Sequence, residues 1–162
     1  MTAELLKIER ESCPAALFIG RKYQKPNWAE WWENGWFEVL EALPGLPVND
    51  DGYIGATRKD EYWIGMFFPL NTPVPNGFEA AEMPAADYAV CYLYGSETGS
   101  ELYSEETRQL CRKAMRERGF VPRTDGWCFE RYNCPRFTTP DEHGKVILDY
   151  AVSVEGVNPS DT

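Results

Sequence analysis

The sequence predicts an α+β fold, in which two helices pack on a sheet of antiparallel strands. The apolar residues repeat with a period of 2 in some segments and 3.6 in others, which indicates strands and helices. The order strand, helix, strand, strand occurs twice. The 162 residues suit one domain with a substantial core. We therefore expect one domain over residues 1–157. It would consist of duplicated halves, about 1–77 and 78–157, related by a pseudo-twofold axis with a ligand groove between them, and 158–162 would be a tail.

The first half is predicted to hold one helix flanked by pairs of strands. Asn27 can cap the helix, and Glu30 three residues later completes a capping-box pattern. Asn34 and Gly35 weaken its middle, so we expect a kink or an early end there. The elements are strands at 5–10, 15–23, 52–57 and 61–68 and a helix over 28–43.

The second half repeats this order. Ser104 can cap a helix whose first turn carries Glu105 and Glu106, where negative charge complements the helix dipole. Gly119 is expected to end this helix. The strands are predicted at 78–83, 88–94, 127–132 and 145–155, and the last alternates cleanly, with Val146, Leu148, Tyr150, Val152 and Val154 on one face.

The charge balance excludes several classes of protein. The chain has 16 basic and 26 acidic side chains, a net charge of −10, which argues against direct binding of nucleic acid. A single histidine, His143, leaves no site with several imidazoles, and its turn-like surroundings predict an exposed loop. Aromatic residues (six Trp, nine Tyr, eight Phe) are too many for a disordered chain.

The five cysteines show no disulfide or zinc spacing and the sequence has no Gly-rich phosphate loop, so we expect no metal site and no cofactor. Cys91, Cys111 and Cys128 are predicted to be buried thiols. No segment has the pattern of a signal peptide or of a membrane-spanning helix, which favours a cytoplasmic protein.

The segment around Glu130 is the most informative for function. As a strand it places Cys128, Glu130 and Tyr132 on one face. Glutamate is uncommon in strands, and a buried carboxylate needs a partner. A ligand cation is one such partner. A solvated face, or a pair with Arg131 or another basic residue, is the alternative.

A second segment, Glu61–Met66, alternates aromatic and aliphatic residues around Gly65. One face of this strand would be core and the other could present Tyr62 or Trp63 to the groove, while ordinary core packing of both is the alternative. Gly65 would allow a close approach to the backbone.

Three further aromatic residues are candidates for the wall of a pocket. Trp32 and Trp36 belong to a tryptophan cluster that is denser than a helix stripe requires, and indole faces attract cations. Tyr92 shares a strand face with two other tyrosines, which would either line a pocket or cover the sheet.

At these residues the chain resembles the GyrI-like family, the effector-binding domains that are also fused to AraC- and MerR-type regulators. The resemblance rests on four features: the duplicated element order, the aromatic-aliphatic-Gly strand at 61–66, the strand-Pro-strand stretch 78–90 and the Phe-Glu-Arg-Tyr motif at 129–132. The third feature departs from the family at Asp87, where glycine is common.

The resemblance implies a groove for hydrophobic, often cationic, small molecules. Glu130 matches the family's central glutamate, and pseudo-symmetry puts Tyr62 and Trp63 on the opposite wall. Some stand-alone relatives are hydrolases that open reactive cyclopropane rings with a glutamate and hydroxyl partners. The sequence has no helix-turn-helix, so a stand-alone protein that does not itself bind DNA is expected.

The leading hypothesis is a broad-specificity binding module for hydrophobic, cationic small molecules. Its ligand-binding residues would be Glu130, Tyr62, Trp63, Tyr132, Trp32, Trp36 and Tyr92. The alternative is a GyrI-like hydrolase of cyclopropane compounds in which Glu130 is the general acid or base. A third hypothesis is an acidic subunit that docks a basic protein. The sequence leaves a monomer and a homodimer equally open.

Overall fold

The computed structural model describes residues 2–43, 52–133 and 135–156, which form one antiparallel sheet and a few helices. This α+β architecture confirms the predicted fold class. In chain order the elements are β1 (Glu4–Cys13), β2 (Ala16–Tyr23), α1 (Trp28–Glu33), α2 (Trp36–Glu41), β3 (Tyr53–Arg58), β4 (Glu61–Phe68), β5 (Glu79–Met83), β6 (Ala86–Ser96), the 3-10 helix η2 (Glu101–Tyr103), α3 (Glu105–Glu117), β7 (Cys128–Tyr132) and β8 (Lys145–Val154). The expected tail at 158–162 lies outside the described residues.

The eight strands follow the order β1-β6-β8-β7-β3-β4-β2-β5. This order reads the same from either end when β1 to β4 are exchanged for β5 to β8. β3 and β7 therefore meet at the middle of the sheet, where Gly55 is opposite Glu130. Such an order is what a duplicated sheet requires, and the duplication itself stays a prediction.

The helix expected over 28–43 is two helices. Asn27 caps α1, since its side chain accepts a hydrogen bond from the Glu30 backbone N–H at 3.3 Å. Gly35 then adopts a left-handed conformation (φ 64°) between α1 and α2, which most side chains avoid. The predicted break at Asn34 and Gly35 is confirmed.

The second-half helix α3 begins as predicted. The Ser104 hydroxyl accepts a hydrogen bond from the Thr107 backbone N–H at 3.2 Å. Thr107, Cys111 and Met115 are fully buried, so this side of α3 faces the sheet. Because residues three to four apart share a helix face, Arg108 and Arg112 are set on a neighbouring stripe.

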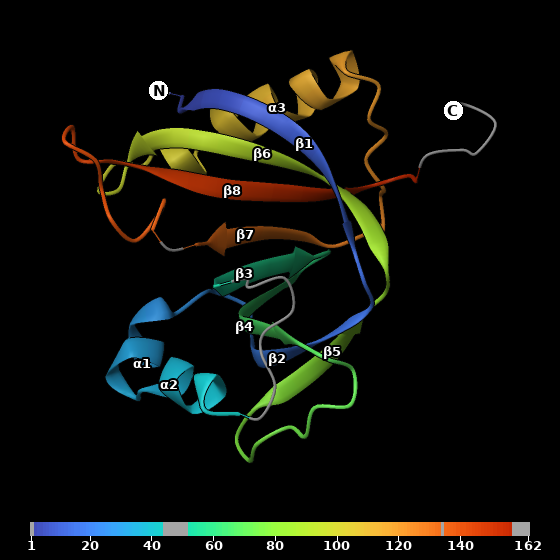
Figure 1. Ribbon diagram of the computed structural model, residues 1–162, viewed down its shortest axis with the longest axis vertical. Coiled ribbons are helices and arrows are strands. Elements are labelled where there is room, and N and C mark those ends of the chain that lie inside the picture. Colours follow the sequence, from blue (N-terminus) through green and yellow to red (C-terminus); the bar gives the residue numbers. More distant parts are fainter. Residues whose placement is uncertain (1, 44–51, 134, 157–162) are drawn as a thin grey trace.

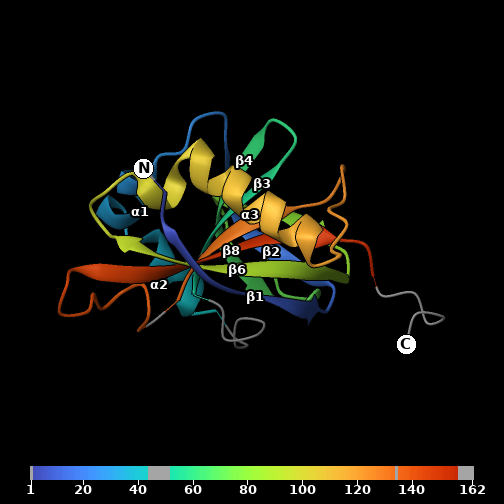
Figure 2. The same ribbon diagram turned by 90° about the horizontal axis from the view of Figure 1, so that it is seen from above.

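The helices α1, α2 and α3 cover one face of the sheet. In Figure 1, α3 lies beside the β1, β6 and β8 half, whereas α1 and α2 lie beside the β2, β3 and β4 half. One buried cluster joins Cys111 and Met115 of α3 to Leu148 of β8, and a second joins Trp31 and Phe37 of the short helices to the first half. The view in Figure 2 shows α3 running obliquely across the strands.

The opposite face of the sheet carries a third buried cluster that joins both halves. Phe67 of β4 and Tyr88 of β6 both contact Phe129 of β7, with ring centroids 5.3 Å and 5.0 Å apart. Of the thiols predicted to be buried, Cys91 and Cys111 are fully buried and Cys128 is half-buried. Within the described ranges, the helices are too short and too polar to cross a membrane.

Candidate functional site

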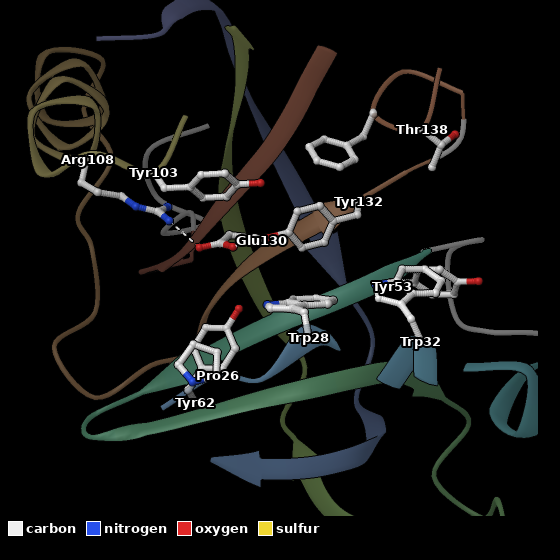
Figure 3. Close-up of a pocket in the computed structure, with 11 residues that line it drawn as sticks. Pro26, Trp28, Trp32, Tyr53, Tyr62, Tyr103, Arg108, Glu130, Tyr132 and Thr138 are labelled. Atoms are coloured by element: carbon white, nitrogen blue, oxygen red, sulfur yellow. Dashed lines mark hydrogen bonds and ion pairs between the residues drawn. The ribbon is translucent and has the colours of Figure 1, made fainter. Parts of the chain in front are cut away.

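A cavity of about 580 Å³ opens on the helical face, where the two halves of the sheet meet (Figure 3). Its walls come from α1, β3, β4, η2, α3, β7 and the segment before β8. The lining is mostly aromatic and includes one acidic and one basic side chain among the described residues: Pro26, Trp28, Trp32, Tyr53, Tyr62, Tyr103, Arg108, Glu130, Tyr132, Phe137 and Thr138.

Strand alternation places the central side chains of this cavity. In β7, Glu130 and Tyr132 point to the helical face, whereas Phe129 enters the cluster on the other face. Gly55 of β3 is paired with Glu130 and has no side chain, which leaves room for the rings above it. A Cβ atom at Gly55 would fall against the Tyr62 hydroxyl and 3.1 Å from the Trp28 ring.

Aromatic rings contact one another around the cavity. Trp28 meets Tyr132 edge to face, with centroids 5.0 Å apart, and Tyr132 meets Phe137 at 4.7 Å. Trp32 packs against Tyr53 at 5.3 Å but remains 60% exposed. A flat apolar ligand could therefore contact fixed ring faces inside and the exposed indole at the edge.

Glu130 has two protein partners in the cavity. Arg108 of α3 donates a hydrogen bond to one carboxylate oxygen, and the Tyr132 hydroxyl donates to the other at 2.5 Å. The side chains of Arg108 and Glu130 are only 17% and 14% exposed. Solvent therefore screens this ion pair less than a surface pair.

The guanidinium group of Arg108 also lies over the Tyr150 ring, 3.9 Å from its centroid. Burial disfavours the charged form of Arg108 and is the largest single effect, but the charge and hydrogen bond of Glu130 together with the neighbouring Tyr150 and Tyr132 outweigh it, so the pKa of Arg108 is raised. Arg108 is therefore a permanent cation beside the carboxylate.

Three tyrosine hydroxyls surround Glu130. Burial raises the pKa of Tyr103 to about 12, and burial together with the charge of Glu130 raises the pKa of Tyr62 and Tyr132 further. These hydroxyls therefore keep their protons near neutral pH and can donate hydrogen bonds.

The structure brings together four of the residues predicted from the sequence: Glu130, Tyr62, Tyr132 and Trp32 all line the cavity. The alternative reading of Glu130 also holds in one respect, because a basic residue of the chain pairs with it. That residue is Arg108 rather than Arg131, which pairs with Asp149 and Glu11.

Two predicted residues point to the opposite face of the sheet. Trp63 follows Tyr62 in β4, so it must face the other way, and it is buried against Phe18 and Trp127. Tyr92 of β6 lies on that same face, where Lys7 sits over its ring at 4.7 Å. Neither side chain lines the cavity.

Trp36 is on the helical face but beyond the cavity. Its ring contacts Trp31 and Phe78, and the Arg21 guanidinium group lies 4.1 Å from its centroid. The break at Gly35 starts a new helix at Trp36, so the stripe that carries Trp28 and Trp32 does not continue through it.

Several lining residues were not predicted from the sequence. Trp28 and Tyr53 are ordinary members of a helix stripe and a strand, and Tyr103 belongs to a short 3-10 turn. Arg108 is one of several basic residues on α3. A pattern along the chain contains no signal for such a residue, because its partner Glu130 is 22 residues away.

No cluster of three or more His, Cys, Asp or Glu side chains that could hold a metal ion occurs among residues 2–43, 52–133 and 135–156. His143 lies in an exposed turn, as predicted, with its side chain 68% exposed and 3.5 Å from Glu142.

Comparison with known proteins finds similarity in structure alone. No family model matches the sequence, and no curated protein matches it significantly. Among solved structures, SAV2435 bound to tetraphenylphosphonium aligns with a TM-score of 0.65 and 12% identity over 93% of this chain and 95% of that one.

A protein of Staphylococcus aureus MU50 assigned to bacterial transcription regulation aligns with a TM-score of 0.58 and 12% identity, over 93% of this chain and 99% of that one. EcmrR, in its complex with DNA in EcmrR-RPo, aligns with a TM-score of 0.59 and 13% identity, over 93% of this chain and 58% of EcmrR. The chain has the fold of these proteins. It is the fold that the GyrI-like resemblance implied.

Proposed function

We propose that this protein binds hydrophobic, cationic small molecules in the cavity between the two halves of the sheet. The observation that carries the proposal is the position of Glu130, the one carboxylate among the described lining residues, inside a ring of aromatic side chains. The cavity volume of about 580 Å³ falls within the roughly 300–1,000 Å³ typical of small-molecule sites.

Two physical effects favour such a ligand. Aromatic walls offer apolar area, and their ring faces attract a cation within about 6 Å. A shielded carboxylate attracts a cation more strongly than a solvated one does, because the effective dielectric constant is lower. Neither effect demands precise directional contacts, so the site should accept ligands of varied shape.

The structural neighbours support the proposal. SAV2435, which has the same fold over nearly its whole length, was determined with tetraphenylphosphonium, a lipophilic cation. One further neighbour is described as a bacterial transcription regulation protein and EcmrR was determined in a complex with DNA, which is consistent with a small-molecule effector site.

A matched pair of probes tests the role of charge: methyltriphenylphosphonium is a cation, and triphenylphosphine oxide is a neutral molecule of nearly the same shape. Binding is followed by calorimetry or by quenching of tryptophan fluorescence. Glu130→Gln should lower the affinity for the cation at least about 10-fold, or about 1.4 kcal/mol, and should change the affinity for the neutral probe less than about twofold.

Glu142→Gln is the control, because that carboxylate is 86% exposed in a turn. It removes the same charge and should change neither affinity. Equal losses of both probes in Glu130→Gln would contradict a charge-based role, and thermal melting of each variant shows whether the fold is retained.

Hydrolysis of a reactive cyclopropane is the alternative function, with Glu130 and a neighbouring tyrosine as its working groups. Both oxygens of Glu130 already accept hydrogen bonds from protein donors, which favours binding. Incubation with an electrophilic cyclopropane separates the two functions. Stoichiometric binding without product supports the binding protein, whereas turnover that Glu130→Gln abolishes supports the hydrolase.

A further inference from the structure

The ion pair between Arg108 and Glu130 limits what Glu130 can do for a ligand (Figure 3). The two charges nearly cancel at a distance, so the cavity does not present a bare negative charge. A ligand cation that approaches Glu130 also approaches the guanidinium group. It must therefore compete with Arg108 for the carboxylate.

Arg108 is incompletely satisfied in this position. Its Nη2 atom donates to Glu130, whereas Nη1 is buried and has no hydrogen-bond partner within the described part of the chain. A buried donor without an acceptor costs free energy. This cost weakens the hold on Arg108, although its stacking on Tyr150 opposes departure.

A second cavity, of about 290 Å³, adjoins the ion pair. Arg108 and Glu130 line both cavities, and Glu105 lines the second one. Glu105 precedes Arg108 by three residues on α3, a spacing that puts the two side chains next to each other. Its exposed carboxylate accepts a hydrogen bond from Gln109 at 2.8 Å and has capacity for more.

We propose that Arg108 is an exchangeable counter-ion: a ligand cation displaces it from Glu130, and Arg108 then pairs with Glu105 in the second cavity. This inference rests on the proposed binding function and adds its specificity-determining residue. Without a cationic ligand, Arg108 neutralises Glu130 and keeps the buried charge paired. With one, the carboxylate changes partner and neither charge is left alone. Neutral ligands leave the original pair intact.

The test measures the affinity of Arg108→Gln for each of the two phosphorus probes. Removal of the competing Arg108 should raise the affinity for methyltriphenylphosphonium about 10-fold or more, while the affinity for triphenylphosphine oxide should change less than about twofold. Arg108→Lys, which retains a positive charge, should stay within about threefold of the parent for the cation. The ratio of the two affinities is the readout, since a loss of packing would change both probes together.

Arg112→Gln is the matched control. Arg112 lies one turn further along α3 and lines the second cavity, but it contacts Tyr150 rather than Glu130. It removes the same charge without freeing the carboxylate, so the cation should tighten less than about twofold. Glu105→Gln should weaken the cation about three- to fivefold, because the displaced Arg108 loses its second acceptor. The double variant Arg108→Gln/Glu130→Gln should bind the cation and the neutral probe with similar affinity.

The outcomes separate the two proposals. If the parent binds the cation and Arg108→Gln binds it no more tightly, the counter-ion role is wrong while the binding function stands. If neither the parent nor Arg108→Gln binds either probe, both the binding function and the counter-ion role are wrong. An equal gain in Arg112→Gln would replace the specific exchange with a general effect of positive charge. An unchanged affinity in Glu105→Gln would remove Glu105 as the second partner.

Discussion

Tyr62 and Trp63 are neighbours in β4, yet Tyr62 lines the aromatic cavity and Trp63 is buried on the opposite face of the sheet. Tyr62→Leu should therefore weaken both phosphorus probes about 10-fold, since it removes a wall rather than a charge. Trp63→Leu should lower the free energy of unfolding by about 2–4 kcal/mol through the cavity it leaves, with little change in affinity. Calorimetric binding and urea unfolding of both variants check this division. A binding loss confined to Trp63→Leu would reverse it.

The close approach at Gly55 gives a second prediction. In Gly55→Ala the added Cβ would press on the Tyr62 hydroxyl and on Trp28. The ring positions must shift, so both probes should weaken about 5–10-fold, and overpacking should cost about 1–3 kcal/mol of stability. In Gly156→Ala the nearest atom would be 3.9 Å away, so that variant should match the parent. Parent-like affinity in Gly55→Ala would show that the walls adapt freely.

Tyr23 attaches α1 to the sheet. Its environment predicts that the protein loses stability in alkali. Its hydroxyl donates to Glu30 at 2.5 Å and accepts from the Trp31 indole at 2.9 Å. Burial, followed by the bond to Glu30, raises the pKa of Tyr23 to about 12. Between pH 10 and 12 the folded state thus binds the proton that the unfolded state has lost. Stability contributed by this group is complete below pH 10 and falls as the pH rises toward 12.

Urea unfolding of the parent and of Tyr23→Phe at pH 8 and pH 11 measures this effect. The variant should be less stable at pH 8 by about 1–3 kcal/mol, because the buried Trp31 N–H loses its acceptor. It should also lose less stability on going to pH 11. Equal losses in the two proteins would assign the alkaline effect to other groups.

Asp149 is the centre of a buried charge network on the face opposite the cavity. It is fully buried and accepts hydrogen bonds from Arg131 at 2.7 Å and from Arg136 at 2.8 Å. Asp149→Asn leaves two guanidinium groups around a neutral side chain, so it should cost about 3–5 kcal/mol in urea unfolding. Glu9→Gln removes an ion pair with Lys7 whose side chains are about half exposed, and it should have no measurable effect. A stable Asp149→Asn would mean that solvent reaches the network.

The strands, the helices and their faces could largely be predicted from the sequence. The break at Gly35, the cap at Ser104 and the alternation around Glu130 are local properties, set by backbone conformation and by a period of two or 3.6. These same periods show that Tyr62 and Trp63 cannot share a face. The resemblance places both on one wall of the groove, and for Trp63 that prediction is wrong because adjacent strand residues point to opposite faces.

The partner of Glu130 was decided by the tertiary structure alone. Arg108 reaches it because α3 packs on β8 through Cys111 and Met115, which turns the adjoining stripe toward the middle of the sheet. Trp36 and Tyr92 are excluded from the site for the same kind of reason, since packing of helices and sheet faces sets their neighbours. The sequence by itself determined which residues share a face and that Glu130 needs a partner. Long-range strand pairing and helix docking decided which faces meet, because those contacts join residues far apart in the chain.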